Sequence, residues 1–139
     1  MQTLETQFDE GIARYKAGES AESLLPTFKE ICLHAPKNSA AQTCLSWLYL
    51  LADKPNAACK AAQRAVKLAP KDPQARVNLA IALLETGKSG VREQVEEVSP
   101  VLAAVDELKA EIQENLEEGL RRKPDWKSLK RVQKWLFEG

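Results

Sequence analysis

Apolar residues recur along this chain at intervals of three and four, the spacing of one face of an α-helix. The clearest such stripe lies just before the turn "DKPN" and consists of Leu45, Leu48, Tyr49 and Ala52. After the turn, Pro55 suits the first turn of a second helix. One face of that helix carries mostly small residues, which let two helices approach closely: Ala58, Ala62, Ala65, Val66 and Ala69. Residues 39–72 therefore predict a helix–turn–helix unit that ends at Pro70, because proline cannot continue a helix interior.

The end of this unit occurs twice in the chain. The segments "HAPKNSAAQT" and "LAPKDPQARV" share an Ala-Pro-Lys sequence followed by Asn or Asp, and Pro36 and Pro70 are 34 residues apart. Asn38 or Ser39, and Asp72 in the second segment, offer N-cap oxygens to the next helix. A single unit of this kind cannot bury its apolar face alone, so the pattern predicts units stacked into an array.

The repeat resembles the tetratricopeptide repeat (TPR), a helix–turn–helix of 34 residues. Residues 39–72 carry residue types of the family signature at Leu45, Ser46, Tyr49, Ala58, Ala65 and Pro70. Residues 73–98 match it at Leu79, Ala80, Leu83 and Gly87, but the second helix of this unit, in the segment "SGVREQVEEVSPVL" (residues 89–102), lacks the small-residue signature.

Residues 4–38 resemble a first TPR-like unit. They match the signature at Gly11, Tyr15, Gly18, Phe28 and Pro36, with a one-residue insertion between Gly18 and Leu24. The early tryptophan position of the family is not aromatic in this chain, where Gln42 and Arg76 occupy it. The resemblance implies an all-α fold, with residues 1–98 forming a right-handed superhelical TPR solenoid.

The resemblance also implies a concave groove lined by the first helix of each unit. The residues that we expect to line it are mostly apolar or aromatic: Phe8, Ile12, Tyr15, Thr43, Trp47, Leu50, Val77, Asn78, Ile81 and Leu84. An apolar surface of this size is typical of a binding site or of an internal contact. Two alternatives follow: a partner segment occupies the groove, or the C-terminal helices of the chain itself cover it.

Chaperone-binding TPR proteins hold a C-terminal carboxylate with Lys, Asn and Arg residues of these first helices. The corresponding positions of this chain hold Phe8, Ile12, Cys44 and Gln74, and only Asn78 suits the role. A two-point grip on a carboxylate needs Lys or Arg donors. We therefore expect no chaperone tail of this kind among the partners.

Residues 99–122 predict one long amphipathic capping helix. Ser99 and Pro100 have the pattern of an N-cap and a first-turn proline. The apolar stripe that follows consists of Val101, Val105, Leu108, Ile112, Leu116 and Leu120. This helix is expected to cover the last repeat, but the nearly heptad spacing also permits self-assembly through residues 101–120.

Charge separates in the C-terminal third. Residues 91–120 hold nine acidic and two basic residues, whereas residues 121–139 hold seven basic and two acidic ones. The terminal segment, residues 123–139, predicts a short helix with Trp126 on its apolar face and a basic surface of Lys127, Lys130, Arg131 and Lys134. Such a helix either packs on the array or docks on an anionic membrane surface or a nucleic acid.

The whole composition indicates a soluble globular protein. The chain has 139 residues, 44% hydrophobic and 29% charged, and its twenty basic residues balance its twenty acidic ones. The polar start "MQTLETQFDE" does not resemble a signal peptide, and no apolar run reaches the length of a membrane span. Its three cysteines suit reduced thiols in a cytosolic protein, so we expect a cytoplasmic location.

Nothing in the sequence points to catalysis. The single histidine, His34, and the nearby Cys32 are two positions apart and would point to different faces of a helix. The chain lacks the common nucleotide-binding and zinc motifs. We expect no enzyme, cofactor or metal site. The prediction is an adaptor or complex-assembly scaffold that binds a helix or extended peptide of another protein.

Overall fold

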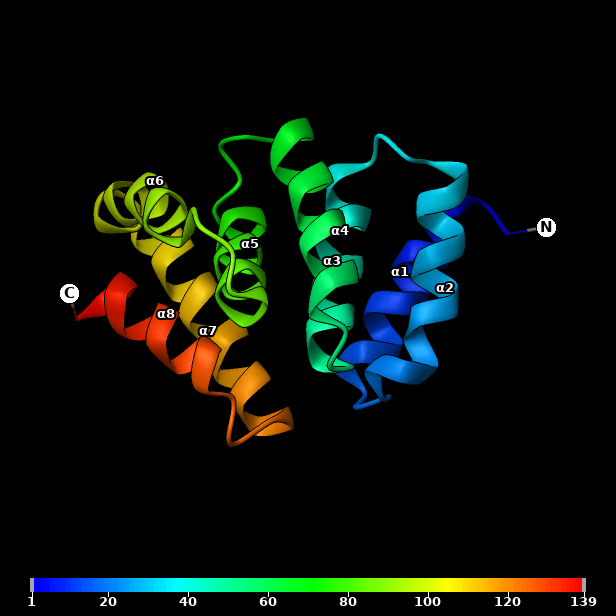
Figure 1. The fold of residues 1–139 in the computed structure, drawn as a ribbon. Coiled ribbons are helices and arrows are strands. Elements are labelled where there is room, and N and C mark those ends of the chain that lie inside the picture. The colour runs from blue at the N-terminus through cyan, green and yellow to red at the C-terminus, as the bar shows by residue number, and fades with distance from the viewer. Residues whose placement is uncertain (1, 139) are drawn as a thin grey trace.

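The computed structural model describes residues 2–138, and these form eight helices and no strand (Figure 1). The outermost residues of the first and last predicted segments, Met1 and Gly139, lie outside the described residues. The helices follow one another as α1 (Leu4–Lys16), α2 (Ala21–His34), α3 (Ser39–Leu51), α4 (Pro55–Leu68), α5 (Pro73–Thr86), α6 (Val91–Ala104), α7 (Asp106–Arg122) and α8 (Lys127–Phe137). The predicted all-α fold class is confirmed.

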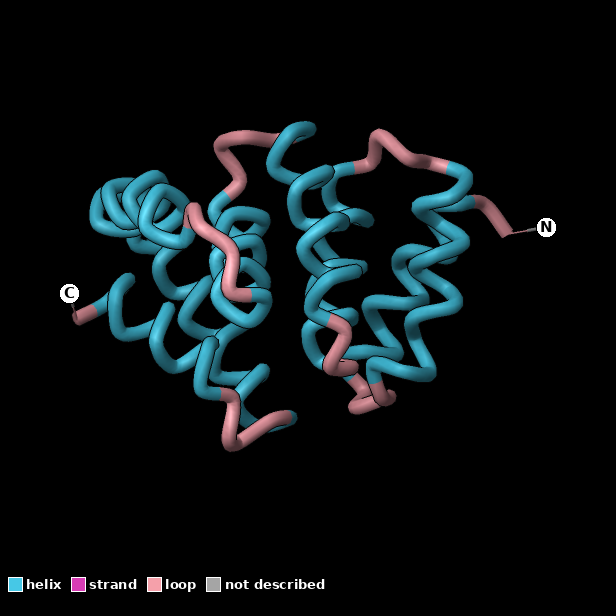
Figure 2. The backbone as a smooth tube through the Cα atoms, in the orientation of Figure 1, coloured by secondary structure: helices cyan, strands magenta, loops and turns pink. Residues whose placement is uncertain are grey.

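The first six helices form three pairs that stack in chain order. Each helix packs on the one before it, and the two termini of the chain lie at opposite ends of the molecule (Figure 1). The connections are short, with at most four residues between consecutive helices (Figure 2). The turn between α1 and α2 has four residues and that between α3 and α4 has three, which agrees with the inserted residue expected in the first unit.

Side-chain caps begin the helices where the sequence predicts them. The Asn38 side chain accepts a hydrogen bond from the amide of Ala41 (3.1 Å), and Asp72 accepts one from the amide of Gln74 (3.0 Å). Pro55 and Pro73 each occupy the first position of a helix. Because these caps satisfy amides that the helix itself leaves unpaired, they fix where α3 and α5 begin.

The core lies between the helix pairs and combines large with very small side chains. The small residues of α4 are fully buried and let α3 and α5 approach it closely: Ala58, Cys59, Ala61, Ala62 and Ala65. Between α1 and α2, the ring of Phe28 lies directly on Gly11, where a Cβ atom would come within 2.7 Å of it. Glycine is therefore required at this crossing.

The third pair extends beyond its predicted end at residue 98. The prediction that a new helix begins at Ser99 is wrong, because α6 continues through Pro100 to Ala104. Val98 and Leu102, on either side of the proline, are buried against the core, and this burial offsets the backbone hydrogen bond that proline cannot make. The chain instead leaves the helical conformation at Val105 (φ −125°, ψ 99°), so the predicted long helix is divided.

The last two helices fold back over the array. The face formed by α1, α3 and α5 is called the inner face below. Helix α7 lies against the inner face, and α8 packs on α5, α6 and α7. The side chains that α7 and α8 bury in this packing are Ile112 and Leu116 of α7 and Leu129 and Val132 of α8, all at most 2% exposed. None of the helices within residues 2–138 combines the length and the apolar character needed to cross a membrane.

Candidate functional site

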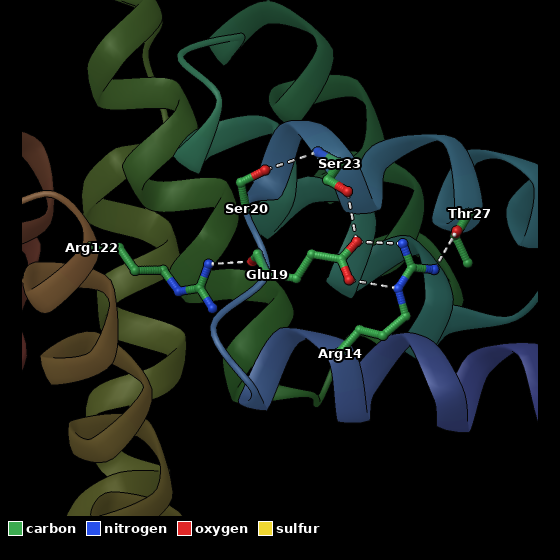
Figure 3. A network of polar contacts seen from close by, with 6 residues as sticks. All are labelled: Arg14, Glu19, Ser20, Ser23, Thr27 and Arg122. Carbon is green, nitrogen blue, oxygen red and sulfur yellow. Dashed lines mark hydrogen bonds and ion pairs between the residues drawn. The ribbon is translucent and has the colours of Figure 1, made fainter.

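The C-terminal end of α7 is bound to the C-terminal end of α1 through Arg122. Its guanidinium donates to the backbone carbonyls of Tyr15 (2.7 Å) and Glu19 (2.9 Å), and Figure 3 shows the second of these bonds. The Tyr15 carbonyl lies in the last turn of α1 and the Glu19 carbonyl in the turn that follows. The C-terminal end of a helix carries partial negative charge, so a cation is favourable there. We call these two hydrogen bonds the α1–α7 contact.

The turn that carries one of these carbonyls is itself held by side chains. The Glu19 carboxylate forms an ion pair with Arg14, whose Nε lies 2.8 Å away, and accepts a hydrogen bond from the Ser23 hydroxyl at 2.6 Å (Figure 3). The Arg14 hydrogen bond lowers the pKa of Glu19 to about 2, and Ser23 acts in the same direction. Ser20 caps the start of α2 by accepting from the amide of Ser23 (3.2 Å). The acceptor for Arg122 is therefore fixed in place.

A second row of contacts joins α7 to α1 and α3. The Tyr15 hydroxyl donates to Glu118, and it accepts from the indole N–H of Trp47 at 2.9 Å. Arg122 lies 4.0 Å above the Tyr15 ring and donates to Glu118 at 3.0 Å. Burial, and then the hydrogen bond to Glu118, raise the pKa of Tyr15 well above its usual value, so the hydroxyl keeps its proton and acts as the donor.

Helix α7 approaches α3 closely at a glycine. A Cβ atom on Gly119 would lie 2.8 Å from the Trp47 ring and 3.1 Å from Leu129, so only glycine fits. On the other side, the Trp47 ring packs on Trp126 with centroids 5.3 Å apart. Trp47 is therefore held between α7 and the start of α8.

A third row is a chain of amide hydrogen bonds from α7 to α3. Asn115 donates to Gln74 (2.9 Å), and Gln74 donates to Asn78 (2.7 Å). Asn78 is fully buried and donates to the carbonyl of Thr43 (3.1 Å) and to the hydroxyl of Ser46 (3.0 Å). The side-chain amide of Asn78 therefore has hydrogen-bond partners inside the protein, where an unpaired amide would cost free energy.

Between these rows lies an open cleft of about 500 Å³. One wall comes from α1, α2 and α3 and is largely apolar, with Ile12, Tyr15, Phe28, Trp47 and Leu48. The opposite wall is the polar face of α7, with Glu111, Glu114, Asn115 and Glu118, and the remaining lining residues are Lys16, Thr43, Cys44, Gln74 and Asn78. We call this space the cleft. Its two walls differ in character, one apolar and one acidic.

Half of the residues predicted to line the groove do line the cleft: Ile12, Tyr15, Thr43, Trp47 and Asn78. Phe8 instead packs edge-to-face on Phe28 (centroids 5.8 Å apart), and Leu84 is half-buried against the core. For Leu50, Val77 and Ile81 the prediction is wrong, because each is at most 1% exposed. All three side chains belong to the hydrophobic core, and α5, which carries Val77 and Ile81, also packs against α7 and α8.

The predicted basic surface of α8 is exposed. Lys127, Lys130, Arg131 and Lys134 all face solvent. The apolar face of the same helix is used for packing, since Trp126 is 4% exposed and its indole N–H donates to Glu85 at 2.6 Å. Trp135 is the exposed aromatic residue of this helix, at 38%.

The predicted self-assembly stripe is also largely used within the chain. Ile112 and Leu116 are at most 2% exposed, whereas Val105, in the break before α7, is 40% exposed. A second copy of the chain would have to displace α7 to use the centre of this stripe.

The sequence interpretation missed the acidic wall. Glu111 and Glu114 belong to a strongly acidic segment, but such a segment is usually a solvated face. Gly119, a small residue beside the apolar stripe of this segment, was the sign in the sequence that α7 approaches another element closely. Residues 2–138 contain no group of three His, Cys, Asp or Glu side chains placed to bind a metal ion.

No protein-family model and no curated protein sequence matches the chain. Among solved structures it is similar to MamA MSR-1 C2, a TPR-containing protein, with a TM-score of 0.60 and 19% sequence identity. The match covers 96% of this chain and 78% of that one. The chain has a TPR-like helical-repeat fold. Similarity at this level of identity concerns the fold alone.

Proposed function

We propose that this protein is an interaction scaffold that binds a helical or extended segment of another protein in the cleft. The observation that carries the proposal is the uncovered apolar wall. Ile12, Tyr15 and Trp47 are each partly exposed at the cleft, whereas Leu50, Val77 and Ile81 of the same face are buried in the core. A concave apolar surface that the chain leaves open is typical of a binding site.

The size of the cleft suits a few anchoring side chains. A volume of about 500 Å³ holds two or three large residues. Protein segments usually gain most of their affinity from such a small number of buried anchors, and the surrounding contacts mainly exclude water. TPR-like arrays present extended inner surfaces of this kind, so the fold supports the proposal.

The cleft is also fixed before a partner arrives. The α1–α7 contact and the amide chain through Gln74 tie the acidic wall to the helices of the apolar wall by hydrogen bonds. A preorganised site loses less conformational entropy on binding, because its side chains are already ordered. This favours recognition of a short segment that supplies only a few contacts.

The test is a selection of peptides on the full-length chain from a random display library, followed by affinity measurement with each selected peptide. Ile12→Glu places a charge on the apolar wall and should weaken binding about tenfold or more, since burying an aliphatic anchor contributes about 1.5–3 kcal/mol. The matched control is Leu33→Glu on α2, at a side chain that is 75% exposed and does not line the cleft. It should bind like the wild type.

A second variant guards against a folding defect at Ile12. Glu114 is exposed, so Glu114→Trp fills the cleft from the opposite wall without disturbing the core, and Glu117→Trp is its counterpart outside the cleft. The proposal predicts weaker binding for the first and unchanged binding for the second. It is refuted if the library yields no peptide, or if the selected peptides bind Ile12→Glu and Glu114→Trp as tightly as wild type.

A further inference from the structure

We infer that the cleft selects partner segments that carry lysine or arginine beside their apolar anchors. This inference rests on the proposed function and adds the chemistry of the partner. It follows from the difference between the two walls: α1 and α3 supply apolar contacts, and α7 supplies carboxylates.

Two of the carboxylates of α7 are available to a partner. Glu111 and Glu114 are exposed at the cleft, and neither forms an ion pair with any residue of 2–138. Glu118 differs, because it is bound to Arg122 and accepts the Tyr15 hydroxyl. Its charge is already satisfied inside the protein.

The apolar wall carries little positive charge to balance these carboxylates. Among residues 2–138, Lys16 is the one cationic residue that lines the cleft. Because Glu118 is paired with Arg122, the free carboxylates of Glu111 and Glu114 against the ammonium of Lys16 leave the cleft with a net charge of about −1. Clefts lined by one sign of charge concentrate the field and attract segments of the opposite sign.

The spacing of the two free carboxylates sets the spacing of the partner's cations. Glu111 and Glu114 are three positions apart on a helix, so they point to the same side and lie roughly 5–6 Å from each other. Cations three or four positions apart on a helical partner have the same separation. Long basic side chains also keep their aliphatic stems against apolar surface while the charge reaches outward, which suits a cleft with one wall of each kind.

An acidic segment would bind poorly for the same reason. Its carboxylates would approach Glu111 and Glu114 without a compensating cation, and like charges brought together in a cleft oppose binding. The two carboxylates therefore disfavour acidic segments as well as attract basic ones.

The test uses two synthetic helical peptides of about 16 residues with the same leucine face. One has lysines on its polar face and the other has glutamates. Their affinities for the full-length protein are measured by fluorescence anisotropy at about 50 mM and about 300 mM salt. A third peptide keeps the lysines but replaces leucine with serine, and it reports attraction by charge alone.

We expect the lysine–leucine peptide to bind about tenfold or more tightly than the glutamate–leucine peptide, and to weaken at the higher salt concentration. The lysine–serine peptide should bind more weakly than the lysine–leucine one. Replacing Glu111 and Glu114 with glutamine should weaken the lysine–leucine peptide about three- to tenfold and reduce its salt dependence. The control Glu107→Gln/Glu117→Gln, on the same helix but outside the cleft lining, should change neither quantity.

The inference is overturned if the lysine–leucine and glutamate–leucine peptides bind equally, if neither binds, or if the double glutamine variant behaves like the wild type. Ile12→Glu separates this failure from a failure of the proposed function. If both peptides bind the wild type equally well and neither binds that variant, the cleft is still the binding site and only the inferred preference for cations is wrong. Should the affinities be unaffected by that variant, the cleft is not the site and both proposals fail.

Discussion

Replacing Arg122 with methionine removes the guanidinium that holds α7 against α1 and leaves a side chain with a similar stem. The substitution deletes hydrogen bonds to the carbonyls of Tyr15 (2.7 Å) and Glu19 (2.9 Å) and the ion pair with Glu118 (3.0 Å). The Arg122 side chain is 18% exposed, so solvent replaces these partners only in part. Hydrogen bonds that involve a charged group contribute about 1.5–3 kcal/mol each. The substitution also removes the free-energy cost of taking the guanidinium out of water, which offsets part of the loss. We expect a loss of about 2–4 kcal/mol in the free energy of unfolding.

Urea denaturation followed by circular dichroism measures this loss, and Arg121→Met is the matched control. Arg121 neighbours Arg122 on α7, is exposed and forms no ion pair within residues 2–138. Its substitution should change the free energy of unfolding by less than about 0.5 kcal/mol. Hydrogen exchange adds a local readout, since Arg122→Met should lower the protection of the α7 amides before that of α3 and α4. Equal stability of the two variants, with unchanged protection of α7, would refute the role given to the α1–α7 contact.

Three further predictions concern packing, pH and thiol chemistry. Gly119→Ala should lower the free energy of unfolding by about 1–2 kcal/mol, because the clash with Trp47 outweighs the gain in helix propensity; a stabilised variant in urea denaturation would contradict this. Arg14 lowers the pKa of Glu19 from its ordinary 4.5 to about 2, so this pair stabilises the fold above pH 4.5 and its contribution is lost as the pH falls toward 2. An NMR titration of the Glu19 carboxyl should show a higher pKa in Arg14→Met, and an unchanged pKa would exclude this cause. Cys32 is 7% exposed and burial raises the pKa of its thiol to about 11, so Ellman's reagent should modify it slowly in the native protein and rapidly in concentrated urea; equal rates would disprove the burial.

The repeat was predictable because its signals are local. The prolines and caps that begin and end the helices act within a few residues of their own positions. The helix starts predicted at Asn38, Asp72 and Pro55 are therefore the ones that the structure shows. Pro100 was misinterpreted for the opposite reason. Whether a proline ends a helix or is tolerated in it depends on whether the flanking residues are buried in the folded protein. Val98 and Leu102 are buried, on a helix that packs on α5, α7 and α8.

The candidate site was only partly predictable because its two walls come from different parts of the chain. The resemblance to TPR repeats placed Ile12 and Trp47 in the groove, and both line the cleft. It could not show that α7 returns across the inner face, since the return depends on bonds such as Arg122 to Tyr15, which join residues 107 positions apart. The same return explains why Ile81 is buried rather than exposed in a groove.

The most direct test of the cleft as a binding site is an NMR titration of the labelled full-length protein with the lysine–leucine peptide. The account predicts that chemical shifts change first at Ile12, at the Trp47 indole and at Glu114, the residues that face one another across the cleft. Helices α2 and α4 should show little change outside it. Changes centred on the outer surface of α2 and α4, or on the basic surface of α8, with the cleft residues unaffected, would contradict the account.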